Sequence, residues 1–343
     1  MTLRRALAVS AAALLALTTA ACGQDDGQEP LSDDALVIYS GRNENLVKGI
    51  LDQLEERTGI DVQVRYGTSS ELAAQLLEEG EGTKADLFFS QDAGALGAVA
   101  KAGRLETLPA ATLDRVQEGF ADDGQKWVAT SARARVIAYD PAQAPEVTEM
   151  TTVDAVLDPK YKGRIGFAPT NASFQTFVTA LRVTKGEDGA REWLEKFKAN
   201  EPKAFDNNIL VLDAVDSGQV ALGLVNHYYW YERVAEKGAS GVKVEIHFLN
   251  ADDPGALVNV AGVGVIAGSP QKDAALKAVD FLLSAEGQRY FADETAEYPV
   301  VPGIESTKHD LVPLEQLKGS SVDLNQLDSL DQTLALLDEV GLT

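Results

Sequence analysis

The sequence is poor in the residues that usually hold soft and borderline metals. Its 343 residues include one cysteine and three histidines. A single cysteine cannot form an intramolecular disulfide. The histidines, His227, His247 and His309, are spread along the chain, whereas zinc sites draw on clusters of Cys and His. A zinc site is therefore not expected.

Basic residues are also scarce. The chain has 30 Lys and Arg against 53 Asp and Glu, which gives a formal net charge of −23. A nucleic-acid partner is not expected, because such a surface needs Lys and Arg to meet phosphate. The excess acidity attracts cations weakly, since salt screens the field within about 10 Å. A solvated acidic surface is the plain interpretation.

Common catalytic signatures are missing as well. The sequence contains no G-x-S-x-G, no H-E-x-x-H and no phosphate-binding loop. Spaced pairs of carboxylates do occur, but 53 acidic residues make such pairs inevitable. We therefore expect a protein that is not an enzyme.

The N-terminus carries an export signal. A basic pair precedes residues 6–21, which are apolar or small and too short for a comfortable membrane-spanning helix. The run ends at Cys22, and its Ala-Ala-Cys-Gly context resembles a bacterial lipoprotein signal, in which the cysteine is acylated. The alternative is an ordinary signal peptide cut nearby. We expect a signal peptide over 1–21, a flexible tether over 22–34, and a protein that is periplasmic or lipid-anchored to the outer face of the cell membrane.

Hydrophobic periodicity predicts alternating strands and helices from residue 36 onward. Leucines and an isoleucine recur at helical spacing over 44–59, and TSSE at 68–71 is a capping box that opens a helix over 69–79. Strands are predicted at 36–39, 61–66, 85–90, 127–140, 164–168, 220–225, 241–248 and 257–268. Further helices are predicted at 92–103, 173–186, 189–200, 209–218, 226–238, 270–284, 286–292 and 330–339. The early alternation is typical of a mostly parallel sheet with helices on both faces.

The segment 225–233, VNHYYWYER, places three tyrosines within four residues. It follows a predicted strand, and Asn226 is the predicted N-cap of the next helix. A phenol, with a pKa near about 10, becomes an anionic oxygen ligand only beside a strong positive charge such as a trivalent cation. Neighbouring residues of a regular helix diverge by about 100°, so Tyr228 and Tyr229 can converge only at a helix edge or in irregular backbone. The alternative is an aromatic patch that packs the helix onto the sheet.

Several segments match one known family. The chain resembles the ferric-ion-binding proteins, the bacterial substrate-binding components of iron ABC importers, and the tyrosine pair is the most specific match. The matching segments are YSGRNENLV (39–47), TGIDVQVRYG (58–67), ADLFFSQDAGALG (85–97), RARVIAYD (133–140), DPKYKGRIGFAPTNASFQ (158–175), VNHYYWY (225–231), DPGALVNVAGVGV (253–265) and ETAEYPV (294–300).

The resemblance implies that Tyr228 and Tyr229 bind Fe(III), and that carbonate or phosphate completes the site as a synergistic anion. The anion would be held where a loop opens a helix, since backbone N–H groups at a helix N-terminus favour anions. The corresponding residues are Asn171, Ala172 and Ser173, assisted by the amide side chains of Asn208 and Asn226. The alternative for these asparagines is helix capping alone.

The chain departs from the family pattern in its first half. Asn43 stands where some members supply a histidine ligand, and Gln91 where some supply a glutamate. Glu44 takes the place of a tyrosine in other members and is a possible replacement carboxylate, the alternative being a solvated glutamate at a helix start. Ser173 likewise replaces a further tyrosine. Arg42 and Arg135 could neutralise the anion or pair with acids.

The resemblance also implies an α/β, two-lobed periplasmic-binding-protein fold of type II, with the ligand cleft between the lobes and two chain crossings. Lobe one would comprise 35–132 plus 258–308, and lobe two 133–257 plus 309–343. A monomer is expected, with an ABC permease and its ATPase as partners. The alternative keeps this fold but binds a small organic solute such as a phosphonate, polyamine or thiamine.

Overall fold

The structure is a computed structural model that describes residues 34–317 and 322–343. The expected signal peptide, Cys22 and all of the expected tether except Asp34 lie outside the described residues. Among the described residues, no helix has both the length and the apolar character needed to cross a membrane.

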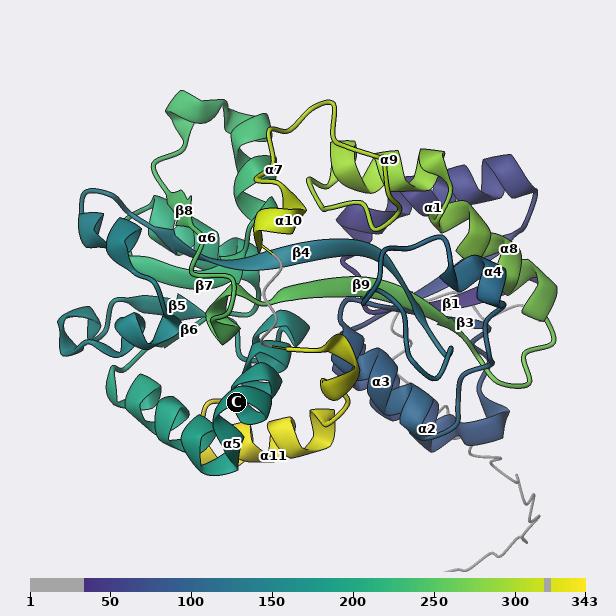
Figure 1. The fold of residues 1–343 in the computed structure, drawn as a ribbon, viewed down its shortest axis with the longest axis horizontal. Helices are drawn as coiled ribbons and strands as arrows, with labels where there is room; N and C mark the ends of the chain where they lie inside the picture. The colour runs from purple at the N-terminus through teal and green to yellow at the C-terminus, as the bar shows by residue number, and fades with distance from the viewer. Residues whose placement is uncertain (1–33, 318–321) are drawn as a thin grey trace, which may run out of the picture. The chain divides into compact units, whose positions relative to one another are not determined.

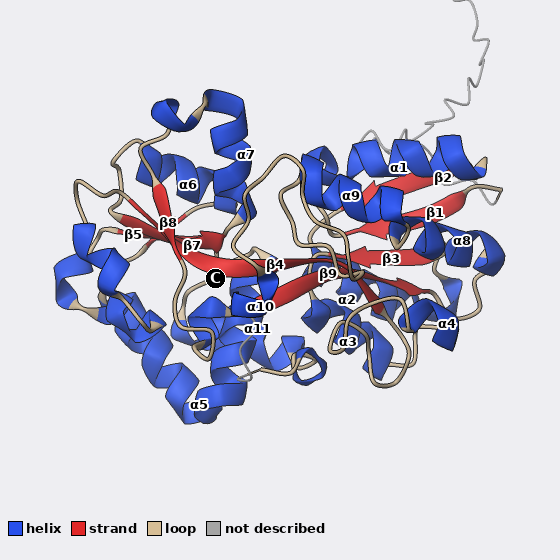
Figure 2. Cartoon of the chain, turned by 45° about the horizontal axis from the view of Figure 1, so that its top comes forward, coloured by secondary structure: helices blue, strands red, loops and turns tan. Residues whose placement is uncertain are grey.

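In the part of the chain that the structure describes, nine strands form one mixed sheet, and helices cover both of its faces (Figures 1 and 2). The strands are β1 (Leu36–Ser40), β2 (Val62–Tyr66), β3 (Leu87–Ser90), β4 (Val128–Tyr139), β5 (Ile165–Phe167), β6 (Lys203–Ala204), β7 (Leu222–Asn226), β8 (Glu245–His247) and β9 (Val258–Val265). The α-helices are α1 (Glu44–Thr58), α2 (Ser69–Glu79), α3 (Ala93–Lys101), α4 (Ala110–Leu113), α5 (Ala172–Ala199), α6 (Asn208–Asp216), α7 (Tyr228–Lys237), α8 (Lys272–Leu282), α9 (Ala285–Glu294), α10 (Leu314–Leu317) and α11 (Leu330–Val340).

Strand β4 belongs to both halves of the sheet. The strand order is β2-β1-β3-β9-β4-β7-β5-β6, with β8 also paired to β4. The first part of β4, up to Ala134, pairs with β9, and the part from Arg135 onward pairs with β7 and β8. Every residue of β4 is buried, as expected for a central strand covered on both faces. The chain passes from one half of the sheet to the other within this strand (Figure 1).

Parallel pairing holds only away from the centre of the sheet. β1 pairs in parallel with β2 and β3, and β5 pairs in parallel with β6 and β7. The long strands β4 and β9 pair antiparallel with each other and with their other neighbours. The expectation of a mostly parallel sheet was therefore wrong for the centre, because the strands that join the two halves run against their neighbours.

Local signals fixed most helix ends. Thr68 and Glu71 form the predicted capping box of α2, and Gly59 ends α1 in the left-handed conformation. The two helices predicted on either side of residue 187 adjoin as α5, with Gly186 in a non-helical, positive-φ conformation at the kink between them. Asn226 is not the N-cap of α7, which was predicted wrongly: it is the last residue of β7, and His227 takes the cap position without a side-chain hydrogen bond.

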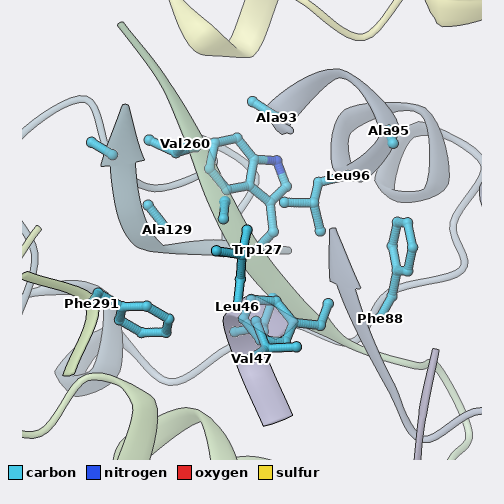
Figure 3. Packing of buried hydrophobic residues seen from close by; sticks show 14 of the residues in the cluster. Leu46, Val47, Phe88, Ala93, Ala95, Leu96, Trp127, Ala129, Val260 and Phe291 are labelled. Carbon is cyan, nitrogen blue, oxygen red and sulfur yellow. The ribbon is translucent and has the colours of Figure 1, made fainter. Parts of the chain in front are cut away.

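The buried core of the first half is built around Trp127, which directly precedes β4. Its side chain is among the largest fully buried ones and lies between Val260 of β9 and Leu96 of α3 (Figure 3). The indole nitrogen has no hydrogen-bond partner among the described residues. Packing of the ring therefore accounts for the contribution of the Trp127 side chain.

Trp127→Ala should lower the free energy of unfolding by about 3–5 kcal/mol, because it leaves a cavity in a close-packed core. Trp127→Phe should cost less, since it keeps most of the ring volume and loses no hydrogen bond. Urea unfolding followed by circular dichroism measures both variants. Equal losses for the two would show that the N–H group, rather than the ring volume, is what matters.

Candidate metal centre

The two adjacent tyrosines lie at the end of β7, where the chain turns into α7. Tyr228 and Tyr229 are the first two residues of that helix, and His227 before them already has helical dihedral angles. Their ring centroids are 4.1 Å apart and the ring planes meet at 36°. The two phenols therefore lie side by side at a helix edge, the geometry that the sequence required for them to share a target.

Both rings are withdrawn from solvent, with exposed fractions of 0% for Tyr228 and 7% for Tyr229. The Tyr228 hydroxyl has no hydrogen-bond partner among the described residues. Burial raises the pKa of Tyr228 well above 10 and also raises the pKa of Tyr229, because a phenolate is poorly solvated there. Without a cation beside them the pair is neutral, and an ionised pair requires a strong positive charge at the hydroxyls.

The polar residues at the start of α5 form one network with α6. The Asn171 side-chain oxygen accepts hydrogen bonds from the Ser173 backbone N–H (3.0 Å) and hydroxyl (2.7 Å). The Asn208 amide donates to Asn171 (3.2 Å) and to the Ser173 hydroxyl (3.1 Å). The side chains of Asn208 and Tyr228 also lower the pKa of Tyr229, although burial outweighs them. Asn171, Ser173 and Asn208 are thus gathered beside the tyrosine pair, with Ala172 as the first residue of α5.

Asn226 is buried in β7, two residues before Tyr228. Neither atom of its side-chain amide has a hydrogen-bond partner among the described residues. A buried amide without a partner costs free energy, and such groups in folded proteins usually serve a ligand or a bound solvent molecule.

Three arginines approach the site. Arg42 forms a fully buried ion pair with Glu297, with N–O distances of 3.0 and 2.5 Å. Arg135 donates to the Ser173 carbonyl (2.9 Å) and lies over the Phe177 ring, and burial lowers its pKa to about 9. Arg42 therefore pairs with an acid, and Arg135 holds the first turn of α5.

Arg133 is different, because it is buried in β4 and none of its three guanidinium nitrogens has a hydrogen-bond partner among the described residues. Burial lowers its pKa, while the neighbouring Tyr228, Glu297 and Asp92 raise it. The sequence pattern around Arg133 is itself a signal. Arg133 alternates with Arg135 in a strand that is otherwise apolar or small, and two arginines on one face of a buried strand point to function.

The three residues from the first half that were possible contributors lie in different surroundings. Asn43 is exposed and caps α1 by accepting from the Asn45 backbone N–H (3.0 Å). Glu44 is also exposed and raises the pKa of Tyr66, on the strand β2. Gln91 is 8% exposed, and its amide nitrogen has no hydrogen-bond partner among the described residues. Their part in a metal site stays a prediction.

Two carboxylates that the sequence analysis did not single out lie around the site, Asp92 near Arg133 and Glu232 near Tyr229. Asp92 is the buried N-cap of α3 and accepts from the Thr176 hydroxyl of α5 (3.2 Å), which links the two halves of the molecule. Glu232 lies one turn into α7, and its charge raises the pKa of Tyr229. Its position three and four residues after the tyrosine pair is the helical spacing that could have identified it.

His227 ties the tyrosine pair to the opposite half of the sheet. Its Nδ1 accepts from the Ala134 N–H (3.3 Å), its Nε2 lies 2.9 Å from the Ala296 carbonyl to which it donates, and its ring stacks on Tyr298. Both ring nitrogens are occupied, so His227 positions the start of α7 and is not a metal ligand. Within residues 34–317 and 322–343 there is no group of three or more His, Cys, Asp or Glu suited to a metal ion.

Acid should destabilise the iron-free protein through His227. Burial lowers its pKa to about 3, against about 6.5 in an unfolded chain. Its contribution to stability is therefore complete above about pH 6.5 and is lost as the pH falls toward 3. Between about pH 7 and about pH 5, the free energy of unfolding should fall by about 2 kcal/mol more in the wild type than in His227→Gln, which cannot titrate. Urea titrations at the two pH values test this, and equal losses would contradict it.

The chain is similar to known proteins over most of its length. Residues 82–324 match the family described as bacterial extracellular solute-binding protein. The major ferric iron-binding protein of Neisseria meningitidis serogroup B is 35% identical over 309 residues, which cover 90% of this chain and 93% of that protein.

Solved structures agree with this similarity. Iron-bound HitA from Pseudomonas aeruginosa is 33% identical, with a TM-score of 0.84 over 90% of this chain and 99% of that one. The Trichodesmium protein IdiA (FutA), solved in complex with iron and citrate ligands, is 27% identical with a TM-score of 0.73, over 90% and 100% of the two chains. The likeness to HitA confirms the predicted two-lobed periplasmic-binding-protein fold.

Proposed function

The chain belongs to the family of bacterial extracellular solute-binding proteins, and we propose that it captures ferric iron outside the cytoplasm for an ABC importer. The observation that carries this proposal is the buried pair Tyr228 and Tyr229, with ring centroids 4.1 Å apart. Ferric iron is a hard cation that prefers anionic oxygen. Two tyrosinates neutralise two of its three charges, and the metal supplies the positive charge that ionises the buried phenols.

An anion is the second part of the proposed ligand. Arg133 offers a buried cationic group that no other described residue satisfies by hydrogen bonding, and Asn226 offers an amide in the same state. The start of α5 adds the positive end of a helix dipole, which favours an anion, while its Ser173 N–H group is already bonded to the Asn171 side chain. The relative solved with iron and citrate supports an anionic companion to the metal. Carbonate, phosphate or a carboxylate such as citrate fits this set of donors.

The proposed mechanism is capture followed by delivery. Iron and the anion enter between the lobes, the tyrosines lose their protons, and the lobes close around the ion by hinge motion. The closed form docks on a membrane permease, whose ATPase drives import. On this proposal the chain is a monomeric binding protein and not an enzyme, held at the outer face of the cell membrane if Cys22 is acylated.

Tyrosinate bound to ferric iron absorbs visible light by charge transfer, so adding ferric citrate to the iron-free protein should colour it. The double variant Tyr228→Phe, Tyr229→Phe should abolish the band, because it removes both oxygen donors and keeps the ring volume. Tyr231→Phe is the matched control, since the Tyr231 hydroxyl donates to the Asp310 carbonyl (3.1 Å). An absorption titration measures all three proteins. A wild type without a band under any anion would contradict the proposal.

Iron affinity should fall as the solution becomes more acidic, because binding releases the two phenolic protons.

The charge-transfer band should also move when bicarbonate is exchanged for phosphate or citrate, since the anion shares the coordination shell. Arg133→Gln should weaken this dependence on the anion. Absorption titrations at fixed pH with each anion in turn measure the effect. A band maximum that is the same with every anion would contradict a role for the anion in the coordination shell.

A further inference from the structure

The helix that carries the tyrosine pair brings a third acidic group to the same face. Successive residues of an α-helix lie about 100° apart around its axis. With Tyr228 at zero, Tyr229 lies at about 100° and Glu232 at about 40°, so Glu232 falls between the two tyrosines and one turn farther along. Helical side chains lean toward the N-terminus of their helix. The Glu232 carboxylate therefore leans back toward the turn that carries Tyr228 and Tyr229.

The charged groups that act on Glu232 are those that surround the tyrosine pair. Arg42 and Glu297 act on Glu232, and the same two groups act on Tyr228. Glu232 itself acts on Tyr229. Arg42, from the other half of the molecule, is thus a charged neighbour of all three side chains, and Glu297 is a neighbour of Tyr228 and Glu232.

Glu232 has no structural partner that would explain its position. It is partly buried, yet it makes no hydrogen bond or ion pair with another described residue. Other side chains of α7 do have such partners. Trp230 donates to the Val244 carbonyl (2.8 Å), and Arg233 pairs with Asp213. Burial and the nearby Glu297 raise the pKa of Glu232 to about 8, which marks a carboxylate without a cation of its own.

We propose that Glu232 supplies a third anionic oxygen ligand to the ferric ion, from the same helix as Tyr228 and Tyr229. This inference rests on the proposed function of the tyrosine pair. Two tyrosinates and one carboxylate balance the three positive charges of the metal. Arg42 and Glu297 already neutralise each other, which leaves Arg133 for the accompanying anion.

A Glu232 ligand also accounts for the amide side chains at positions 43 and 91, where some family members have a histidine and a glutamate ligand. Neither Asn43 nor Gln91 offers an anionic donor. With Glu232, all three anionic protein donors come from the first two turns of α7. Iron is then held by one lobe before the lobes close. Closure shields the ion from solvent and adds no anionic protein ligand.

Glu232→Gln in the full chain tests the proposal, with Glu236→Gln as the matched control. Glu236 lies on the same helix, is 73% exposed and is 3.7 Å from Arg233, so it loses the same charge away from the tyrosines. The probe is ferric nitrilotriacetate at fixed pH and bicarbonate. The charge-transfer band reports the tyrosine bonds, and competition with citrate reports the affinity.

Glu232→Gln should keep a charge-transfer band, shift its maximum and lower the iron affinity by about tenfold or more, whereas Glu236→Gln should match the wild type. The iron-free Glu232→Gln protein should not unfold at a lower temperature, because the change removes a carboxylate near Glu297. If Glu232→Gln folds poorly, Glu232→Asp is the second variant, and it should keep part of the wild-type affinity because it keeps a carboxylate.

Unchanged band and affinity in Glu232→Gln would overturn the proposal. A lower unfolding temperature with an unchanged band would overturn it too, since it would show a structural role. A wild type without any band would contradict the ferric-iron function itself, so the two failures are distinguishable.

Discussion

The cost of burying charge governs the centre of this molecule. Two arginines lie in β4, a strand buried along its whole length; Tyr228 and Glu297 act on Arg133, and Tyr229 acts on Arg135. A buried ion is tolerated when it meets an opposite charge and its hydrogen bonds are made. Arg42 and Glu297 meet that condition within the chain. Arg133, Glu232 and the tyrosine pair do not, and their mutual arrangement suits a cation and an anion that arrive together.

The crossing strand makes this arrangement possible. β4 pairs with β9 before residue 135 and with β7 after it, so Arg133 and Arg135 sit where the two halves of the sheet meet. β7 ends at the same place, directly before the tyrosine pair, and the His227 ring between them is hydrogen-bonded to Ala134 and Ala296. Asp92 and Thr176 add a hydrogen bond between α3 and α5. The candidate site is thus built by elements that also hold the two halves of the sheet together.

The tyrosine pair was open to prediction because its chemistry is local. Adjacent phenols after a strand needed only a helix edge to converge, and the first turn of α7 supplies one. The hydrogen bond between Asn171 and Ser173 was open to prediction for the same reason, since both lie at one helix start, and their part in an anion site stays a prediction. Asn226 was misassigned as a cap because N-cap preference is a weak local signal, and the pairing of Asn226 with Arg135 in the sheet overrode it. Strand alternation at Arg133 and helical spacing at Glu232 are local signals, whereas the charged groups that surround these two residues come from distant segments.

The alternation of strands and helices, the capping box at Thr68 and the candidate oxygen donors at 228 and 229 could be predicted from local sequence, because each depends on residues close along the chain. Contacts between distant segments set the rest: β4 and β9 run antiparallel through the middle, Arg42 is neutralised by a residue 255 positions away, and Arg133 is left without a partner among the described residues. These outcomes depend on which segments meet in space. Local propensity carries no information about that, because long-range pairing is set by burial and charge across the whole fold.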